Sequence, residues 1–216
     1  MKTAAVIPAY NEKDRIGAVI SAVKAAGIVD EIVVVSDGST DGTYELVASD
    51  ADITAVDLLI NMGKAGAMRA GAMATDADVI LFLDADITGL DGSKVDSLLE
   101  PIVAGTADMS IGIFKGGRSV TDLAQFVAPY ISGQRALRRE VFLGIPGLDD
   151  VRSGVEIAIT KYAESHEFRV TRVSLPGCTH CMKEEKLGLA KGLAARMRMY
   201  IDIGRIVLDG HKYRRK

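Results

Sequence analysis

Asp84 and Asp86, which directly follow the apolar run 79–83, are the residues of this 216-residue chain whose types and spacing most clearly suggest chemistry. Residues i and i+2 of a strand point the same way, so the two carboxylates would face one another. Left unpaired, they would repel each other and be costly to desolvate. A hard divalent cation with oxygen ligands would stabilise both, and it would bring a diphosphate with it. Two helix-capping aspartates are the structural alternative.

Lys64 stands in the segment Gly63-Lys64-Ala65-Gly66, at the predicted start of a helix. Backbone N–H groups at a helix start, together with an ammonium group, suit a phosphate. The segment is not a Walker motif, because Ala65 follows Lys64 and the upstream glycine spacing differs. The first predicted strand is not followed by G-x-G-x-x-G, which disfavours a dinucleotide-binding fold.

The first two predicted strands also end in polar, loop-forming residues. The first ends in Pro8-Ala9-Tyr10-Asn11-Glu12, and the second ends in residues 36–43, which include Asp37. Gly, Asp and Asn are ordinary loop residues, and this alone explains any single loop. The succession of such loops, one after each predicted strand, favours one shared site.

Regular elements must carry these loops to one place. Apolar runs typical of buried strands occupy 3–7, 31–36, 53–59 and 79–83, and helices are predicted over 12–26, 40–49 and 64–75. Asp41 to Glu45 resembles a capped helix start. The alternation predicts an α/β fold with a mostly parallel sheet flanked by helices. Ligands of such sheets bind beyond the carboxyl ends of the strands.

The second half of the chain is less regular. Its pattern predicts strands over 107–114 and 168–174, and helices over 121–128, 153–165 and, as a long amphipathic C-terminal helix, 187–209. We find no repeat or linker, and therefore expect a single domain over 1–216. Within it, residues 1–90 would form a nucleotide-binding half and residues 91–216 an acceptor-binding half.

Composition and charge limit the classes of function. Hydrophobic residues make up 48% of the chain and charged residues 25%, which excludes disorder. Two cysteines form no disulfide framework, and neither a membrane-spanning run nor a signal-peptide core is apparent, so we expect a cytoplasmic protein. Residues 180–216 carry ten basic and four acidic residues, whereas the whole chain has a net charge of −3. The acidic body argues against nucleic-acid binding.

Taken together, the four strand-end segments resemble the family 2 glycosyltransferases of the GT-A fold. The resemblance implies that Pro8, Ala9, Tyr10 and Glu12 hold the nucleoside of a nucleotide-sugar. It also implies that Asp37 contacts the base, Lys64 the diphosphate side, and Asp84-Ala85-Asp86 the ribose and a metal ion. The metal expected is Mn²⁺ or Mg²⁺, and the donor expected is UDP-glucose. Ala65 replaces the glycine usual in this family.

Two later segments are similar to the acceptor-side segments of glucosyl-3-phosphoglycerate synthases. They are residues 132–140, which include Gly133 and Arg135, and residues 153–158, which include Glu156. The resemblance implies that Gly133 and Arg135 bind an acceptor and that His180 completes the metal site with Asp86. Glu156 would be a general base or would orient the acceptor. An ordinary first-turn glutamate remains the alternative.

Other interpretations stay open at this point. Cys178-Thr179-His180-Cys181 could be a redox pair or half a zinc site, although no second ligand pair is found. The basic C-terminal helix could pack on the body, pair two copies in a homodimer, or touch the inner face of a membrane, which would suit a polyprenyl-phosphate acceptor. A small phosphorylated acceptor would equally explain Arg135, Arg138 and Arg139.

The sequence thus predicts a metal-dependent glycosyltransferase that moves a sugar from a UDP-sugar to a phosphorylated acceptor. Two rival functions remain. A nucleotidyltransferase that makes nucleotide sugars would normally carry a glycine- and arginine-rich loop after its first strand, where this chain has Pro-Ala-Tyr-Asn-Glu. A catalytically silent nucleotide-binding or membrane-associated scaffold would not need Lys64, Asp84, Asp86 and Glu156 together.

Overall fold

The computed structural model describes residues 1–115, 132–148 and 154–180. The elements in these ranges follow one another in this order: β1 (Thr3–Ala9), α1 (Ile16–Lys24), β2 (Glu31–Asp37), α2 (Thr43–Ala48), β3 (Ile53–Leu58), α3 (Gly63–Met73), β4 (Val79–Phe82), β5 (Ile87–Thr88), α4 (Gly92–Val103), β6 (Met109–Lys115), β7 (Arg135–Arg138), α6 (Arg139–Gly144), α7 (Val155–Ser165), β8 (Val170–Pro176) and β9 (Thr179–His180).

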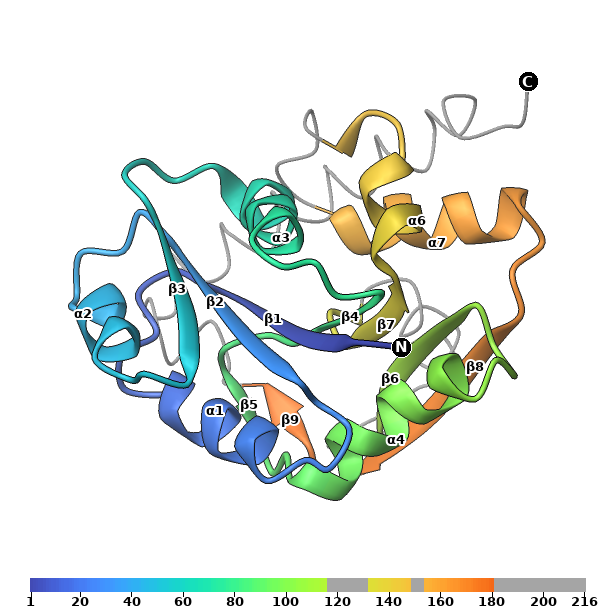
Figure 1. Ribbon diagram of the computed structural model, residues 1–216, viewed down its shortest axis with the longest axis horizontal. Helices are drawn as coiled ribbons and strands as arrows, with labels where there is room; N and C mark the ends of the chain where they lie inside the picture. The colour runs from blue at the N-terminus through green and yellow to red at the C-terminus, as the bar shows by residue number, and fades with distance from the viewer. Residues whose placement is uncertain (116–131, 149–153, 181–216) are drawn as a thin grey trace, which may run out of the picture.

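A seven-stranded sheet in the order β3-β2-β1-β4-β7-β6-β8 forms the centre of the molecule, as Figure 1 shows. The pairs of β1 with β2 and β4, of β2 with β3, and of β6 with β8 are parallel. Only β7 runs against its neighbours, pairing antiparallel with β4 and with β6. The predicted mostly parallel sheet flanked by helices is therefore confirmed.

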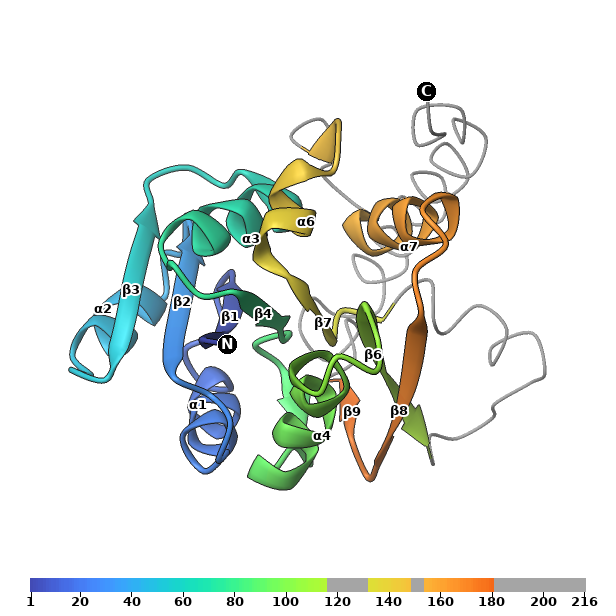
Figure 2. The same cartoon turned by 45° about the vertical axis from the view of Figure 1, so that its right-hand side comes forward.

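Two apolar cores lie on opposite faces of this sheet, because successive residues of a strand point to opposite faces. Ala5 and Ile7 of β1 face α1 and α4, whereas Val6 between them faces α3. The second face is also covered by α6 and α7, and Figure 2 shows the two helical layers with the sheet between them. The central strands are buried on both sides, which explains their continuous apolar sequences.

The antiparallel direction of β7 determines what meets at the carboxyl edge of the parallel strands. In the register of β7 with β4, Arg135 at the start of β7 pairs with Phe82 at the end of β4. The residues before Arg135 therefore lie beside those after Phe82, which include Asp84. Arg138, at the other end of β7, pairs with Val79 at the far edge of the sheet.

Several predicted boundaries need correction. The helix predicted over 12–26 begins only at Ile16, because the preceding residues are tied to the start of α2: the Glu12 N–H donates to Thr43 Oγ1. The helix predicted over 40–49 begins at Thr43, and Asp41 accepts from the Thr43 N–H just before it. Helix α4 was not predicted, although Asp91 caps it by accepting from the Lys94 N–H.

The predicted helices over 121–128 and 187–209 lie outside the described residues, as do Cys181 and the basic C-terminal segment. Among the residues that the structure does describe, no helix is both long and apolar enough to cross a membrane.

Substitution of Gly71 in α3 tests how closely this helix packs on the sheet. A Cβ there would lie 2.4 Å from Val6 Cγ1 and 3.0 Å from Val35 Cγ2, so we expect Gly71→Ala to lower the free energy of unfolding by about 2 kcal/mol. Gly17 in α1 is the matched control, because nothing lies within 4 Å of a Cβ added there. Gly17→Ala should be neutral or slightly stabilising. Urea unfolding of both variants makes the comparison, and equal effects would contradict the packing.

Asp108, before β6, accepts two hydrogen bonds from the Arg169 guanidinium and one from its backbone N–H. These bonds lower the pKa of Asp108 to about 2, so the pair stabilises the fold above the carboxylate's usual pKa and loses this effect as pH falls toward 2. Both side chains are partly exposed, and solvent screening limits the gain. We expect Asp108→Asn to cost about 1 kcal/mol at pH 7 and much less near pH 2. Denaturant unfolding at several pH values measures this difference, and a pH-independent cost would contradict it.

Candidate active site

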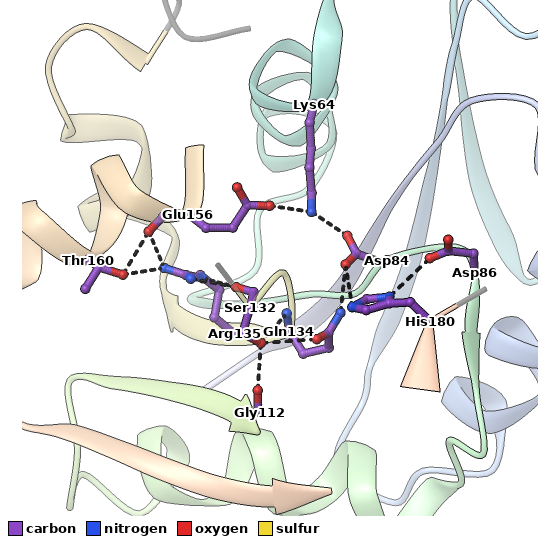
Figure 3. Close-up of polar contacts among 10 residues, drawn as sticks. All are labelled: Lys64, Asp84, Asp86, Gly112, Ser132, Gln134, Arg135, Glu156, Thr160 and His180. Carbon is purple, nitrogen blue, oxygen red and sulfur yellow. Dashed lines mark hydrogen bonds and ion pairs between the residues drawn. The ribbon is translucent and has the colours of Figure 1, made fainter. Parts of the chain in front are cut away.

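Asp84, two residues beyond the end of β4, is the central carboxylate of the site. Its Oδ1 lies 2.5 Å from Lys64 Nζ, and its Oδ2 accepts from Gln134 Nε2 at 2.8 Å. His180 Nε2 lies 3.8 Å from the same Oδ2 (Figure 3). Burial alone would raise the pKa of Asp84, but the neighbouring Lys64 ammonium outweighs it and holds the pKa below its usual value.

Lys64, in the first turn of α3, lies between two carboxylates. Its Nζ is 2.5 Å from Asp84 Oδ1 and 2.5 Å from Glu156 Oε1. Burial would lower the pKa of Lys64, but both carboxylates raise it well above its usual value. The ammonium is therefore charged at neutral pH and joins two elements that are far apart in the sequence, α3 and α7.

Asp86 and His180 meet through the small β5–β9 sheet, in which Ile87 pairs with His180. His180 Nδ1 lies 3.4 Å from Asp86 Oδ1. One oxygen each of Asp84 and Asp86 and one ring nitrogen of His180 all lie within 4.8 Å of one another. Carboxylate and imidazole donors are ordinary ligands of divalent cations, so this donor set fits a Mn²⁺ or Mg²⁺ ion.

Glu156 reaches the site from the first turn of α7, with its carboxylate directed at Lys64 in Figure 3. Its backbone carbonyl accepts from Arg135 Nη1 at 2.9 Å and from Thr160 Oγ1 at 2.8 Å. The predicted catalytic carboxylate thus lies next to the predicted diphosphate-side lysine. Sequence reasoning did not indicate that one ammonium would contact both Asp84 and Glu156.

Arg135 is completely buried beneath the site. Its Nη1 also donates to Thr160 Oγ1 at 3.2 Å, and its Nε and Nη2 donate to the Ser132 carbonyl at 3.1 and 2.6 Å. The guanidinium is thus engaged with the chain's own acceptors. The prediction that Arg135 contacts an acceptor is not tested by these contacts and stays a prediction.

Arg138 and Arg139 lie at the end of β7 and directly after it. Arg138 pairs with Val79 at the opposite edge of the sheet, and Arg139 Nε donates to the Ala72 carbonyl at 2.7 Å. β7 carries Arg138, and Arg139 directly after it, away from Asp84, and their contact with a phosphorylated acceptor stays a prediction.

Gly133 and Gln134 lie against Asp84. A Cβ at Gly133 would be 2.3 Å from Asp84 Oδ2, so only glycine allows this approach. The sequence analysis did not predict a role for Gln134. Its polar side chain between the predicted residues Gly133 and Arg135 was the signal that could have indicated one. Whether Gly133 touches an acceptor stays a prediction.

Asp37, at the end of β2, fixes the start of α3. Its Oδ1 accepts from the Met62 N–H at 2.7 Å and its Oδ2 from the Gly63 N–H at 3.0 Å. Asp37 thus engages two of the N–H groups at this helix start, and contact of Lys64 with the diphosphate side of a nucleotide-sugar stays a prediction. Gly38 has a φ of +69° and closely approaches the backbone of Asn61.

The remaining predicted nucleoside residues come from the end of β1 and the loop after it. Pro8 and Ala9 end β1, Tyr10 is half exposed, and Glu12 accepts from Arg15 Nη1 at 2.9 Å. This loop is tied to the loop after β2, since the Asn11 N–H donates to Ser39 Oγ. Ala85, between the two aspartates, is buried. Contact of these residues with a nucleotide stays a prediction.

Cys178 is buried, and its Sγ donates to the Gly89 carbonyl at 3.3 Å. Burial raises the pKa of its thiol, which disfavours a reactive thiolate. His180 of the same segment instead lies with Asp84 and Asp86.

Comparison with known proteins places this geometry in context. A solved structure of glucosyl-3-phosphoglycerate synthase from Mycobacterium tuberculosis, in complex with Mn²⁺, UDP and glucosyl-3-phosphoglycerate, superposes with a TM-score of 0.67. It is 26% identical, and the match covers 83% of this chain and 72% of that chain. The expected GT-A type of α/β fold is thereby confirmed.

The curated relatives include glucosyl-3-phosphoglycerate synthases and a lipid-phosphate glucosyltransferase. The synthase of Mycobacterium tuberculosis is 27% identical in an alignment of 190 positions that covers 71% of this chain and 58% of that protein. The synthase of Mycolicibacterium smegmatis is 33% identical in an alignment of 106 positions that covers 45% of this chain and 35% of that protein. A dolichyl-phosphate beta-glucosyltransferase of Trichomonas vaginalis is 35% identical in an alignment of 104 positions that covers 42% of this chain and 29% of that protein. The chain thus spans about a third to three fifths of these synthases.

A family model described as "Glycosyl transferase family 2" matches residues 4–183, which include every described strand and helix apart from the first residue of β1. The chain therefore belongs to glycosyltransferase family 2.

Proposed function

We propose that this chain transfers glucose from UDP-glucose to a phosphorylated small-molecule acceptor in a reaction that depends on Mn²⁺ or Mg²⁺. The observation that carries the proposal is the position of Lys64, which contacts Asp84 and Glu156 beside the Asp84–Asp86–His180 group. The Mycobacterium tuberculosis synthase supports the choice of donor and acceptor, because its complex with UDP and glucosyl-3-phosphoglycerate matches most of this chain.

Asp86 and His180, with Asp84 beside them, would hold the metal ion. When bound, the ion supplies Lewis-acid stabilisation of the charge that grows on the leaving diphosphate. Lys64 adds a second positive charge on the same side, and its contact with Glu156 holds that carboxylate toward the reacting centre.

Glu156 would act on the acceptor. In the transfer, an acceptor oxygen forms a bond to C1 of the sugar, and the bond from C1 to the diphosphate oxygen breaks with its electron pair leaving on UDP. If the anomeric centre inverts, Glu156 accepts the proton of the acceptor hydroxyl; if it is retained, Glu156 orients the acceptor and the leaving diphosphate oxygen takes that proton. NMR of the product's anomeric proton distinguishes the two roles.

The first experiment is calorimetric titration with UDP, UDP-glucose and GDP-mannose, each with Mn²⁺ and with EDTA. Metal-dependent binding of UDP and UDP-glucose supports the proposal. A screen for UDP release then compares 3-phosphoglycerate, glycerol 3-phosphate and a polyprenyl phosphate. Turnover with only the polyprenyl phosphate would show that the acceptor is a lipid phosphate and not a small molecule. Pyrophosphate release from a nucleoside triphosphate would indicate a nucleotidyltransferase, and binding without turnover would indicate a scaffold.

We expect Asp86→Asn and His180→Ala to weaken Mn²⁺-dependent UDP binding by about tenfold or more, because each removes a ligand of the ion. Asp76→Asn is the matched control, since this carboxylate is 83% exposed and lies before β4, at the opposite edge of the sheet. Titrations with and without Mn²⁺ give the result. Wild-type metal dependence in both site variants would refute the metal assignment.

We expect Glu156→Gln to lower kcat by about a hundredfold if Glu156 is the base, since the amide keeps the shape but cannot accept the proton. UDP affinity should change little, because the substitution leaves Asp84, Asp86 and His180 in place. Calorimetry and UDP-release kinetics on the same preparation separate the two effects. A kcat equal to that of the wild type would exclude Glu156 from the proton transfer and leave it an orienting role at most.

A further inference from the structure

The segment 132–135 touches both sides of the site, the donor side at Asp84 and the acceptor side at Glu156. We propose that this segment is a clamp that sets the position of Glu156 relative to Asp84, with Gln134 and Arg135 as its positioning residues. The inference rests on the proposed function, because it assumes that Asp84 lies on the donor side and that Glu156 acts on the acceptor.

The acceptor half of the clamp is the contact of Arg135 with the first turns of α7. Arg135 Nη1 donates to the Glu156 carbonyl at 2.9 Å and to Thr160 Oγ1 at 3.2 Å. The Thr160 hydroxyl in turn donates to the Glu156 carbonyl at 2.8 Å. The Glu156 backbone is thus held from two directions, and its carboxylate is directed at Lys64.

The donor half is the contact of Gly133 and Gln134 with Asp84. Gln134 Nε2 donates to Asp84 Oδ2 at 2.8 Å, and the missing side chain of Gly133 lets the backbone approach the same carboxylate. The Gln134 N–H donates to Ser132 Oγ at 3.4 Å, and the Asp84 carboxylate, which can only accept, selects the amide orientation in which the NH₂ group faces it.

Strand β6 anchors both halves. Ser132 Oγ donates to the Gly112 carbonyl at 2.6 Å, and the Gly112 N–H donates to the Gln134 carbonyl at 2.8 Å. Because Gln134 and Arg135 are consecutive in an extended chain, their side chains leave in different directions. One short segment, fixed to the sheet, therefore determines the positions of both carboxylates.

The chemistry of Arg135 fits positioning better than stability. Burial lowers the pKa of its guanidinium to about 10, which still leaves it charged at neutral pH. A buried charge is costly, and an apolar side chain of similar volume is often as stable in such a place. What an apolar residue could not do is bridge the Ser132 and Glu156 carbonyls with donors in a rigid fork.

Thr160→Val and Thr160→Ser test the acceptor half, because the first removes the hydroxyl and the second keeps it. We expect Thr160→Val to lower kcat by about tenfold with unchanged UDP–Mn²⁺ affinity, and Thr160→Ser to restore most of kcat. Gln134→Met tests the donor half. We expect its UDP–Mn²⁺ affinity to fall by about tenfold, and this weaker binding should account for most of its loss in kcat/KM. Equal losses of kcat in Thr160→Val and Thr160→Ser would overturn the clamp. So would the same division of the loss between kcat and UDP–Mn²⁺ affinity in Thr160→Val and Gln134→Met.

Crystal structures of the two Thr160 variants provide a readout that needs neither donor nor metal. The clamp predicts that the 2.5 Å contact between Lys64 Nζ and Glu156 Oε1 is lost in Thr160→Val and kept in Thr160→Ser. An unchanged contact in Thr160→Val refutes it. This readout also separates the two proposals. If the wild-type protein binds no UDP, the proposed function is contradicted, but the position of Glu156 in the Thr160 variants still tests the clamp. Arg135→Met removes the guanidinium of the clamp altogether. If this variant does not fold, the two Thr160 variants still test the proposal.

Discussion

The direction of β7 is the constraint on which the site depends. If β7 ran parallel to β4, its first residues would lie at the amino edge of the sheet, and the 132–135 segment would be far from Asp84. The antiparallel pairing of Arg135 with Phe82 instead places that segment at the carboxyl edge, where the loops of the first half meet. Residues separated by about fifty positions in sequence therefore hydrogen bond, as Gln134 and Asp84 do.

Charge balance explains why these residues can lie so close together. Asp84 and Glu156 are largely buried carboxylates, and each would be costly to desolvate alone. Lys64 between them offsets that cost for both, while the buried Arg135 adds a second positive charge below. Removal of one partner would leave the others uncompensated, so the group acts as a unit. In the proposed reaction, such a unit would keep Asp84 and Glu156 at a fixed separation, which is a condition for transfer between two bound molecules.

The first half of the fold, and the meeting of its strand-end loops at one edge of the sheet, were largely predictable, because they depend on local sequence. Each buried strand is a continuous apolar run, and each is followed by a polar loop at the same edge of the sheet. The second half depends on pairing between distant segments, which no local pattern reveals. The direction of β7 could not be predicted from its four residues, so the sequence did not show that Arg138 lies at the edge of the sheet opposite to Arg135. The burial of Arg135 was missed for the same reason, whereas the pairing of β9 with β5 placed His180 where it was expected.

At the start of α3, the Asp37 carboxylate engages two backbone N–H groups that the sequence alone would leave for a ligand. In isolation, Gly63-Lys64-Ala65-Gly66 offers free N–H groups and an ammonium, which together suit a phosphate. In the fold, Asp37 accepts from the Met62 and Gly63 N–H groups and so attaches the start of α3 to the end of β2. Lys64 follows directly, and its side chain is delivered to Asp84 and Glu156 from a helix whose start is fixed. The same aspartate that the family resemblance assigns to the base thus also positions the lysine, so the two ends of a bound nucleotide would be held by one connected set of hydrogen bonds.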